Sequence, residues 1–283
     1  MIKNIIPICL FALGLTACGG GGSSDTSNTG ANVINASAMN GIYVGEGSES
    51  GFGTFELIAF IQGGQIRAVA DTGVGYSGAL TAKEDGTYQS SLTLYDFDYA
   101  AFDTAGVQGN FESASFFDGS YERSSGPSGS FSATYSAAAY EQPASLDMID
   151  GTWAVTNATV SNSITINTNG DFFGTDADGC VYSGEISVPN PNRNLYQADL
   201  LIESCGSVNG SYTGLIGAGI NSSGDTLLML VSNSPFGFAF DHQNYKHCCA
   251  APVIDPWPLP VPHAKLAPPS QVARAPLCRE LAD

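Results

Sequence analysis

Residues Asn169–Tyr212 read NGDFFGTDADGCVYSGEISVPNPNRNLYQADLLIESCGSVNGSY, and this stretch decides the fold class. Four short runs that resemble β-strands are separated by Gly, Asn, Asp and Pro, which are the residues of tight turns. The dipeptides Asn169-Gly170 and Asp178-Gly179 are typical of two-residue hairpin turns. The stretch therefore predicts short antiparallel β-strands joined by tight turns.

A fainter copy of this pattern lies upstream, as GGQIRAVADTGVGYSG from Gly63 and TYQSSLTL from Thr87. Tyr76-Ser77-Gly78 aligns with Tyr182-Ser183-Gly184, and Tyr88-Gln89 aligns with Tyr196-Gln197. An internal repeat of this size favours two units of one fold. We expect the first β unit at residues 39–135, a connector at 136–148 and the second β unit at 149–241.

Both units are expected to be small all-β structures, either antiparallel barrels or sandwiches, with about eight short strands each. In the first unit the predicted strands are Gly53–Ile61, Gln65–Ala70, Gly75–Thr81, Tyr88–Tyr95, Gly109–Ser115, Ser120–Arg123 and Gly129–Tyr135. In the second they are Thr152–Thr156, Ser163–Asn167, Asp171–Thr175, Cys180–Val188, Leu195–Ser204, Gly210–Gly217, Thr226–Ser232 and Phe236–Asp241. No substantial helix is expected in either unit.

The charge balance restricts the possible partners. The chain carries 27 acidic and 9 basic residues, which gives a formal net charge of −18. This charge argues against nucleic acid or anionic lipid head groups as partners. All three histidines, His242, His247 and His263, follow the second unit. The two units therefore lack the side chain that most often transfers protons near neutral pH, and no catalytic residue, metal or cofactor is expected.

The N-terminus, Met1–Cys18, reads MIKNIIPICLFALGLTAC, and its apolar run is too short to span a bilayer as a stable helix. Its end, Leu15-Thr16-Ala17-Cys18, resembles the lipobox of bacterial lipoproteins. The resemblance implies that residues 1–17 are a signal peptide and that acyl chains anchor Cys18 permanently. Gly19 stands where an aspartate would retain such a protein at the inner membrane, which implies the outer membrane, on its periplasmic face or at the cell surface. The alternative is an ordinary signal peptide followed by a chance cysteine.

The segments that flank the two units have unusual compositions. Residues 18–38 are rich in Gly and Ser and predict a flexible tether. Residues 242–283 are rich in Pro and Ala and predict a mobile, disordered tail. The composition changes so sharply that a reading-frame error in the gene is an open alternative for the tail. The sequence leaves open how Cys248, Cys249 and Cys278 would pair, and a metal site of His242, His247, Cys248 and Cys249 is disfavoured.

Cys180 and Cys205 are predicted to form a disulfide, because an exported protein meets an oxidising compartment. The repeat alignment supports this pairing. It places Val74 opposite Cys180 and Phe97 opposite Cys205, so two apolar residues of one copy stand where the other copy has cysteines. We expect both pairs to be buried and adjacent.

Two segments that contain aspartates resemble known functional sites. Asp171, Asp176 and Asp178 resemble a calcium-binding loop, but a hairpin turn is favoured because the later bidentate glutamate is missing. Asp71-Thr72-Gly73 resembles the aspartic-protease triplet, but that chemistry needs a second carboxylate and Asp71 aligns with Ala177.

The one candidate binding loop is acidic and aromatic. It comprises Tyr95, Asp96, Asp98, Tyr99 and Asp103 and would suit a basic protein or a sugar. The alternative is a solvated loop with some of its aromatic rings tucked underneath.

The second unit also resembles a class of uncharacterised bacterial lipoprotein domains. The matching segments are Gly151-Thr152-Trp153, Gly179–Gly184, Asn194–Tyr196, Cys205-Gly206 and Asn209–Gly214. The resemblance supports a cell-envelope setting and implies no activity.

The expected function is that of a non-enzymatic outer-membrane lipoprotein whose two β-rich modules contact a protein or the envelope. Three alternatives stay open. The chain could inhibit a basic enzyme such as lysozyme, or act as an envelope hydrolase through paired carboxylates among Glu185, Asp199 and Glu203. It could also be a lipocalin-like carrier of small apolar ligands, which needs a barrel with an empty interior.

Overall fold

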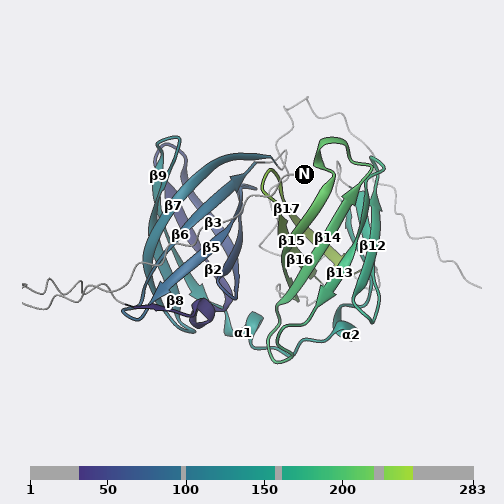
Figure 1. Cartoon of the computed structure of the whole chain (residues 1–283), viewed down its shortest axis with the longest axis horizontal. Coiled ribbons are helices and arrows are strands. Elements are labelled where there is room, and N and C mark those ends of the chain that lie inside the picture. The colour runs from purple at the N-terminus through teal and green to yellow at the C-terminus, as the bar shows by residue number, and fades with distance from the viewer. Residues whose placement is uncertain (1–31, 97–99, 157–160, 220–225, 245–283) are drawn as a thin grey trace, which may run out of the picture. The chain divides into compact units, whose positions relative to one another are not determined.

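The computed structural model describes residues 32–96, 100–156, 161–219 and 226–244, which belong to one compact unit. These residues are almost entirely β-structure, as predicted, and form two rolled antiparallel sheets (Figure 1). The helices among them are short: η1 (Ala36–Met39), α1 (Ala137–Tyr140), α2 (Leu146–Ile149) and η2 (Gly206–Val208). None of these described helices is long and apolar enough to cross a membrane.

The first sheet has nine strands and the second has eight. The first comprises β1 (Val33–Ile34), β2 (Gly41–Glu49), β3 (Gly53–Gln62), β4 (Gln65–Ala70), β5 (Gly75–Lys83), β6 (Thr87–Tyr95), β7 (Ala101–Glu112), β8 (Phe116–Arg123) and β9 (Ser128–Tyr135). The second comprises β10 (Gly151–Thr156), β11 (Ser161–Ile166), β12 (Asp171–Asp176), β13 (Val181–Ser187), β14 (Tyr196–Glu203), β15 (Gly210–Ala218), β16 (Thr226–Ser232) and β17 (Gly237–Asn244).

Strand pairing rolls both sheets up. In the second sheet β17 returns to β10, where Ala154 lies opposite Gln243, and the barrel closes. In the first sheet each strand from β2 to β9 pairs with the next, and β9 returns to β2, where Tyr43 lies opposite Tyr135. Closure leaves few exposed edges for unwanted pairing with other chains. The barrel alternative is therefore the correct one of the two predicted architectures.

Under the repeat alignment, β5 pairs with β6 in the first barrel in the same register as β13 pairs with β14 in the second. Tyr76 lies opposite Leu94 in the first ring, and Tyr182 lies opposite Ile202 in the second. A slip of one residue would turn each strand's side chains to the other face. The shared register therefore supports two copies of one fold. Val74 is only half-buried, and Phe97 lies outside the described residues, so their predicted contact stays a prediction.

Each barrel has an interior packed with large side chains. The first encloses Tyr43, Ile61, Tyr88, Leu94 and Phe117, and the second encloses Trp153, Ile166, Phe172, Tyr196 and Tyr212. Most are within a few per cent of complete burial. Such aromatic residues fill the space inside an eight-stranded ring, which is just wide enough for side chains.

A third apolar cluster lies on the outer faces of both barrels. It joins Ile58 and Phe60 of β3 to Leu215 of β15 and Leu228 and Leu230 of β16. These residues alternate with interior ones, so β3 and β16 are buried on both faces. This explains their almost continuous apolar sequences, which are typical of strands without a solvent-facing side.

The structure corrects the predicted elements in several places. β1 pairs with β5, although residues 18–38 were expected to be a flexible tether, and β8 begins at Phe116, before its expected start at Ser120. β2 was not predicted as a strand, and β7 begins at Ala101 although residues up to 108 were not expected to be strand. Glycines at positions 41, 45 and 47 of β2, and the small interior residues Ala105 and Gly109 of β7, weaken the apolar alternation. β17 continues to Asn244, past the expected end at Asp241, because its last residues pair with β10 and close the barrel.

Candidate interaction surface

The predicted disulfide between Cys180 and Cys205 is confirmed, with a Cα–Cα distance of 4.6 Å. Cys180 directly precedes β13 and Cys205 follows β14, and these two strands are neighbours. The two sulfurs and a carboxylate oxygen of Asp176 lie within 4.8 Å of one another. Because the sulfurs are bonded to each other, they are not the thiolates that a metal requires.

Asp176 organises the hairpin between β12 and β13. Its Oδ1 accepts hydrogen bonds from the backbone N–H groups of Asp178 and Cys180, and its Oδ2 accepts one from the Tyr182 hydroxyl. A carboxylate satisfied by protein donors in this way forms an Asx-type turn. These hydrogen bonds support the interpretation of this segment as a hairpin turn. Asp71 has a different role, since its Oδ1 accepts a hydrogen bond from the Glu56 N–H and so ties the hairpin before β5 to β3.

The residues of the predicted binding loop do not form one exposed surface. Tyr95 is buried, and its hydroxyl donates to the carbonyl of Asn233, which agrees with the alternative of an aromatic ring tucked under the loop. Asp103 points into the first barrel, and only 3% of its side chain is exposed. Asp96 accepts a hydrogen bond from the Ala100 N–H and so closes a turn. Asp98 and Tyr99 lie outside the described residues, as do Cys18, His247, Cys248, Cys249, Cys278 and both flanking segments apart from residues 32–38 and 242–244.

Asp103 belongs to a charged cluster inside one end of the first barrel. Arg123 binds Asp103 and Glu49, each at 2.8 Å, and the Tyr121 hydroxyl donates to Glu49. Hydrogen bonds from Ser124 and Ser125, together with Arg123, hold the pKa of the Asp103 carboxyl well below its usual range. The sequence did not indicate this cluster, because its members are far apart in the chain.

The low pKa of Asp103 predicts sensitivity to acid. The unfolded chain binds a proton on this carboxyl more readily than the folded chain, so the carboxylate's contribution is complete above the unfolded pKa. We expect the melting temperature to fall as the pH drops from about 5 toward 2, in part through Asp103. Asp103→Asn should lower the melting temperature at pH 7 and flatten this acid-dependent fall. A pH profile parallel to that of the wild type would contradict the assignment.

Three neighbouring strands of the second barrel carry an exposed apolar row. Phe173 of β12 lies opposite Ser183 of β13, which in turn lies opposite Leu201 of β14. Phe173, Leu201 and the nearby Val181 are 57%, 39% and 37% exposed. Large apolar side chains grouped in this way are unusual on a surface without a partner. This outward face of β12, β13 and β14, with its flanking carboxylates, is called the β12–β14 face below.

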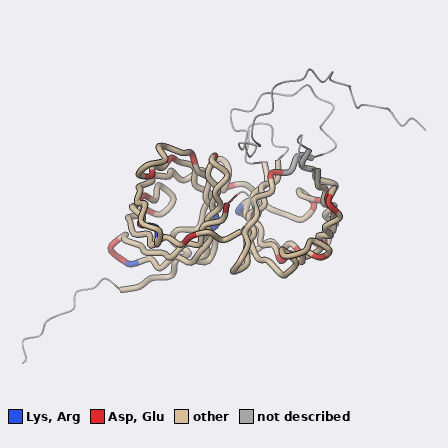
Figure 2. Tube along the Cα trace, turned by 90° about the horizontal axis from the view of Figure 1, so that it is seen from above, with Lys and Arg blue, Asp and Glu red and all other residues tan. Residues whose placement is uncertain are grey.

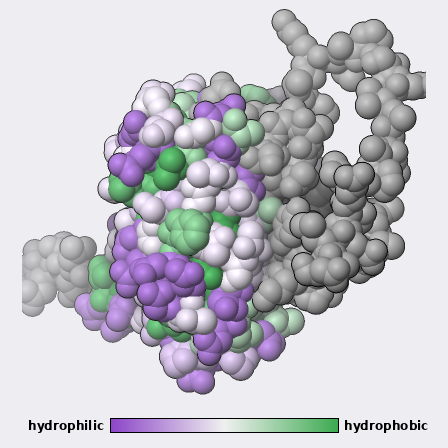
Figure 3. All heavy atoms as spheres, turned by 90° about the vertical axis from the view of Figure 1, so that its right-hand side faces the viewer, coloured by the Kyte–Doolittle hydropathy of each residue, from purple (hydrophilic) through white to green (hydrophobic). Residues whose placement is uncertain are grey.

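Carboxylates flank the apolar row. Asp171, Glu185 and Asp199 lie directly opposite one another across the three strands, and Glu203 lies beyond Leu201 on β14. All four are exposed. Figure 3 views the side of the molecule on which β12 and β13 lie, and hydrophobic groups there border strongly hydrophilic ones. Figure 2 shows acidic residues on both sheets and few basic residues near them.

The acidic row lowers the stability of the fold, since like charges directly opposite on neighbouring strands repel. A cationic group bound beside the row would remove that repulsion. Glu185, Asp199 and Glu203 were candidate carboxylates from the sequence, but their spacing did not indicate that an apolar row lies between them. The signal was present in the alternation of β14, where exposed Leu201 falls between exposed Asp199 and Glu203.

The interior of the second barrel offers little room for a ligand. A cavity of about 10 Å³ is lined by Asn162, Phe172, Tyr182, Met229 and Phe240, among others. That volume is about the size of one water molecule. Asn162 is buried and its Oδ1 has no hydrogen-bond partner among the described residues, so a single water is the occupant that this space suits.

Comparison with known protein families, curated proteins and solved structures finds no match to this chain in any of the three.

Proposed function

We propose that this chain is a non-enzymatic binding protein whose β12–β14 face docks a basic region of a partner protein. The exposed row of Phe173 and Leu201, flanked by Asp171, Glu185 and Asp199, is the observation that carries the proposal. In this proposal Cys18 anchors the chain to the outer membrane, and the segment between Cys18 and β1 forms the tether that presents the two barrels.

The composition of the β12–β14 face fits a protein partner. Protein interfaces have an apolar centre, often with an aromatic anchor, and a polar rim. Phe173 supplies the aromatic anchor, and Val181 and Leu201 extend the centre. The strand hydrogen bonds hold these side chains in a fixed arrangement, so little ordering is needed on binding.

The charge of the face selects the class of partner. Four carboxylates surround the apolar row, in a chain whose net charge is −18. A cationic partner would be attracted at long range and would then pair with the rim. An inhibitor of a basic enzyme such as lysozyme is one form of this function.

The same geometry gives less support to the other two alternatives. Glu185 and Asp199 lie opposite each other, as a carboxylate pair would need, but both are exposed on the outside of the barrel. Acid–base catalysis by carboxylates relies on a site whose burial or neighbours shift one pKa away from the other. A carrier of apolar ligands needs an empty interior, whereas the second barrel is packed.

Two triple variants of equal charge test the proposal. Glu185→Gln/Asp199→Asn/Glu203→Gln neutralises part of the β12–β14 face. Glu46→Gln/Glu56→Gln/Glu112→Gln removes three exposed carboxylates of the first barrel. Binding to lysozyme and to cytochrome c, used as basic probe proteins, is measured by calorimetry at low salt. We expect the first triple to weaken binding about tenfold or more and the second to weaken it much less.

Comparing the two triple variants shows whether binding depends on the β12–β14 face or only on the net charge of the protein. Equal weakening by both triples would show that only net charge matters and would overturn the proposal. Absence of binding by the wild-type chain to either basic protein would also overturn it. Phe173→Ser, which removes the aromatic anchor without changing the charge, should weaken binding as well if the apolar row contacts the partner.

A further inference from the structure

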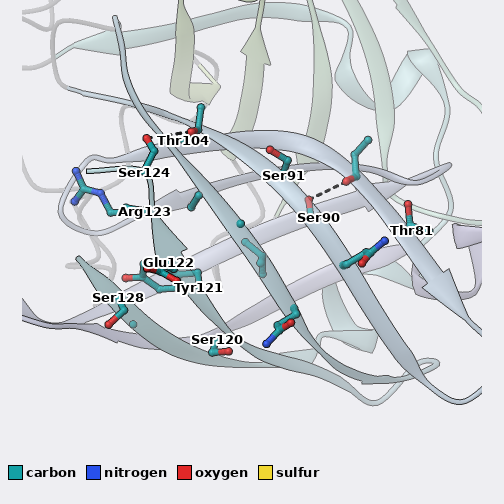
Figure 4. A pocket seen from close by; sticks show the side chains of 17 residues that line it. Thr81, Ser90, Ser91, Thr104, Ser120, Tyr121, Glu122, Arg123, Ser124 and Ser128 are labelled. Carbon is teal, nitrogen blue, oxygen red and sulfur yellow. Dashed lines mark hydrogen bonds between the residues drawn. The ribbon is translucent and has the colours of Figure 1, made fainter. Parts of the chain in front are cut away.

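A large open hollow lies on the outside of the first barrel, whereas the β12–β14 face belongs to the second (Figure 4). Its volume is about 1070 Å³, and its walls come from strands β5 to β9. A second hollow of about 590 Å³ borders it and shares Gln89, Gln108 and Ser120 with it. Together they form one continuous surface, which we call the polar groove.

Small side chains in one cross-strand row create the groove. Ala79, Ser91, Gly106, Glu122 and Ser128 lie opposite one another in succession across β5, β6, β7, β8 and β9. Glu122 is the one long side chain in this row. A Cβ atom added to Gly106 would meet nothing within 4 Å, so the floor is open there. At a strand spacing of roughly 4.8 Å, the row is about 19 Å long.

The next row forms the wall between the two hollows. Thr81, Gln89, Gln108 and Ser120 lie opposite one another across β5 to β8. The side chains of Gln89, Ser91, Gln108 and Ser120 have no hydrogen-bond partner within the part of the chain that the structure describes. Figure 4 shows the hydroxyl groups of Ser91, Thr104, Ser120 and Ser128 distributed along the groove.

The lining is almost neutral, which is notable in so acidic a chain. Of the charged residues at the larger hollow, Arg123 is paired inside the barrel with Asp103 and Glu49, which leaves Glu122. The smaller hollow adds Lys83 and Asp118, whose charges are opposite. Hydroxyl and amide groups both donate and accept hydrogen bonds. An apolar ligand would leave these groups unpaired, and a cationic or anionic ligand would find few opposite charges.

The lining and length of the polar groove suit a neutral oligosaccharide, whose hydroxyl groups also both donate and accept. Phe102, two residues before Thr104 on β7, is 43% exposed but lines neither hollow, and the Arg123 guanidinium lies over its ring at 5.1 Å from the centroid. The hydroxyl and amide groups of the lining therefore carry the argument for a sugar. We propose that the polar groove of the first barrel binds a neutral glycan chain of several sugar units.

This site is independent of the proposed function, because it lies on the other barrel and needs no basic partner. The test titrates the full exported chain with the neutral probes cellohexaose, maltohexaose and chitohexaose, and with the anionic hexamer of galacturonic acid. Backbone amide chemical shifts and calorimetry report binding. We expect at least one neutral hexamer to bind with a sub-millimolar dissociation constant and to shift the amides of Ser91, Gly106 and Gln108.

Two variants with a phenylalanine on the same barrel locate the binding. Gly106→Phe fills the open floor, whereas Ser132→Phe adds the same ring to an exposed position of β9 that lines neither hollow. We expect the first to reduce affinity at least tenfold and the second to leave it unchanged, with similar melting temperatures. Failure of all three neutral hexamers to bind at millimolar concentration, preference for the anionic hexamer, or equal loss in both variants would overturn the proposal.

Discussion

Replacing Cys180 and Cys205 together with alanine is expected to lower the free energy of unfolding of the second barrel by about 2–5 kcal/mol. The bond joins residues 25 positions apart in the sequence. In the chain-entropy account, closing a loop of this length restricts the unfolded chain and contributes about 3 kcal/mol. Chemical denaturation of the double variant and the wild type gives the difference directly.

The strands that lose protection from hydrogen exchange show whether the loss of stability is local or global. Hydrogen exchange should show reduced protection in β13 and β14, which the bond joins, while β7 and β8 of the first barrel remain protected. Wild-type protein treated with a reductant serves as the matched control, because it loses the bond without a change in side-chain volume. A double variant as stable as the oxidised wild type would contradict this prediction.

Gly109→Ala is expected to destabilise the first barrel by about 3 kcal/mol, because the site has no room for a methyl group. Gly109 of β7 lies opposite Gly119 of β8 and faces the interior. A Cβ atom at Gly109 would overlap the backbone carbonyl of Asp118, which cannot move without opening the strand pair. The same carbonyl accepts a hydrogen bond of 3.1 Å from the Tyr88 hydroxyl, so its position is held from both sides.

The matched control lies in the same strand. Gly106 faces outward, and an added Cβ there would meet nothing within 4 Å. Gly106→Ala should therefore leave stability unchanged or raise it by about 0.5 kcal/mol, because alanine restricts the unfolded chain more than glycine does. Thermal denaturation of the two variants compares them directly. Equal effects on stability would show that close packing of β7 on β8 does not determine where β7 tolerates an added methyl group.

Local patterns predicted most of the second barrel. All eight of its strands were expected near their observed positions, because turn residues such as Asn169-Gly170 punctuate short alternating runs. The first barrel was predicted less completely. Its β2 and β7 carry glycine and alanine at interior positions, and such small residues give little apolar alternation although they allow neighbouring strands to approach closely.

The candidate surfaces were predicted far less well, for a physical reason. Sequence alternation shows which residues of one strand share a face, but register decides which residues of neighbouring strands meet. Phe173 and Leu201 form a row only because β12, β13 and β14 pair as they do. Likewise Arg123 meets Glu49 and Asp103 only because the first sheet rolls up.

The sequence by itself determined the all-β class, the internal repeat, the disulfide and the acidic charge, because each depends on residue type and local spacing. The tertiary structure alone decided that the rings close, that β3 and β16 are buried on both faces, and where exposed groups gather. It also turned Tyr95 and Asp103 away from solvent. These features depend on contacts between residues far apart in the chain, and such residues meet only when the rings close.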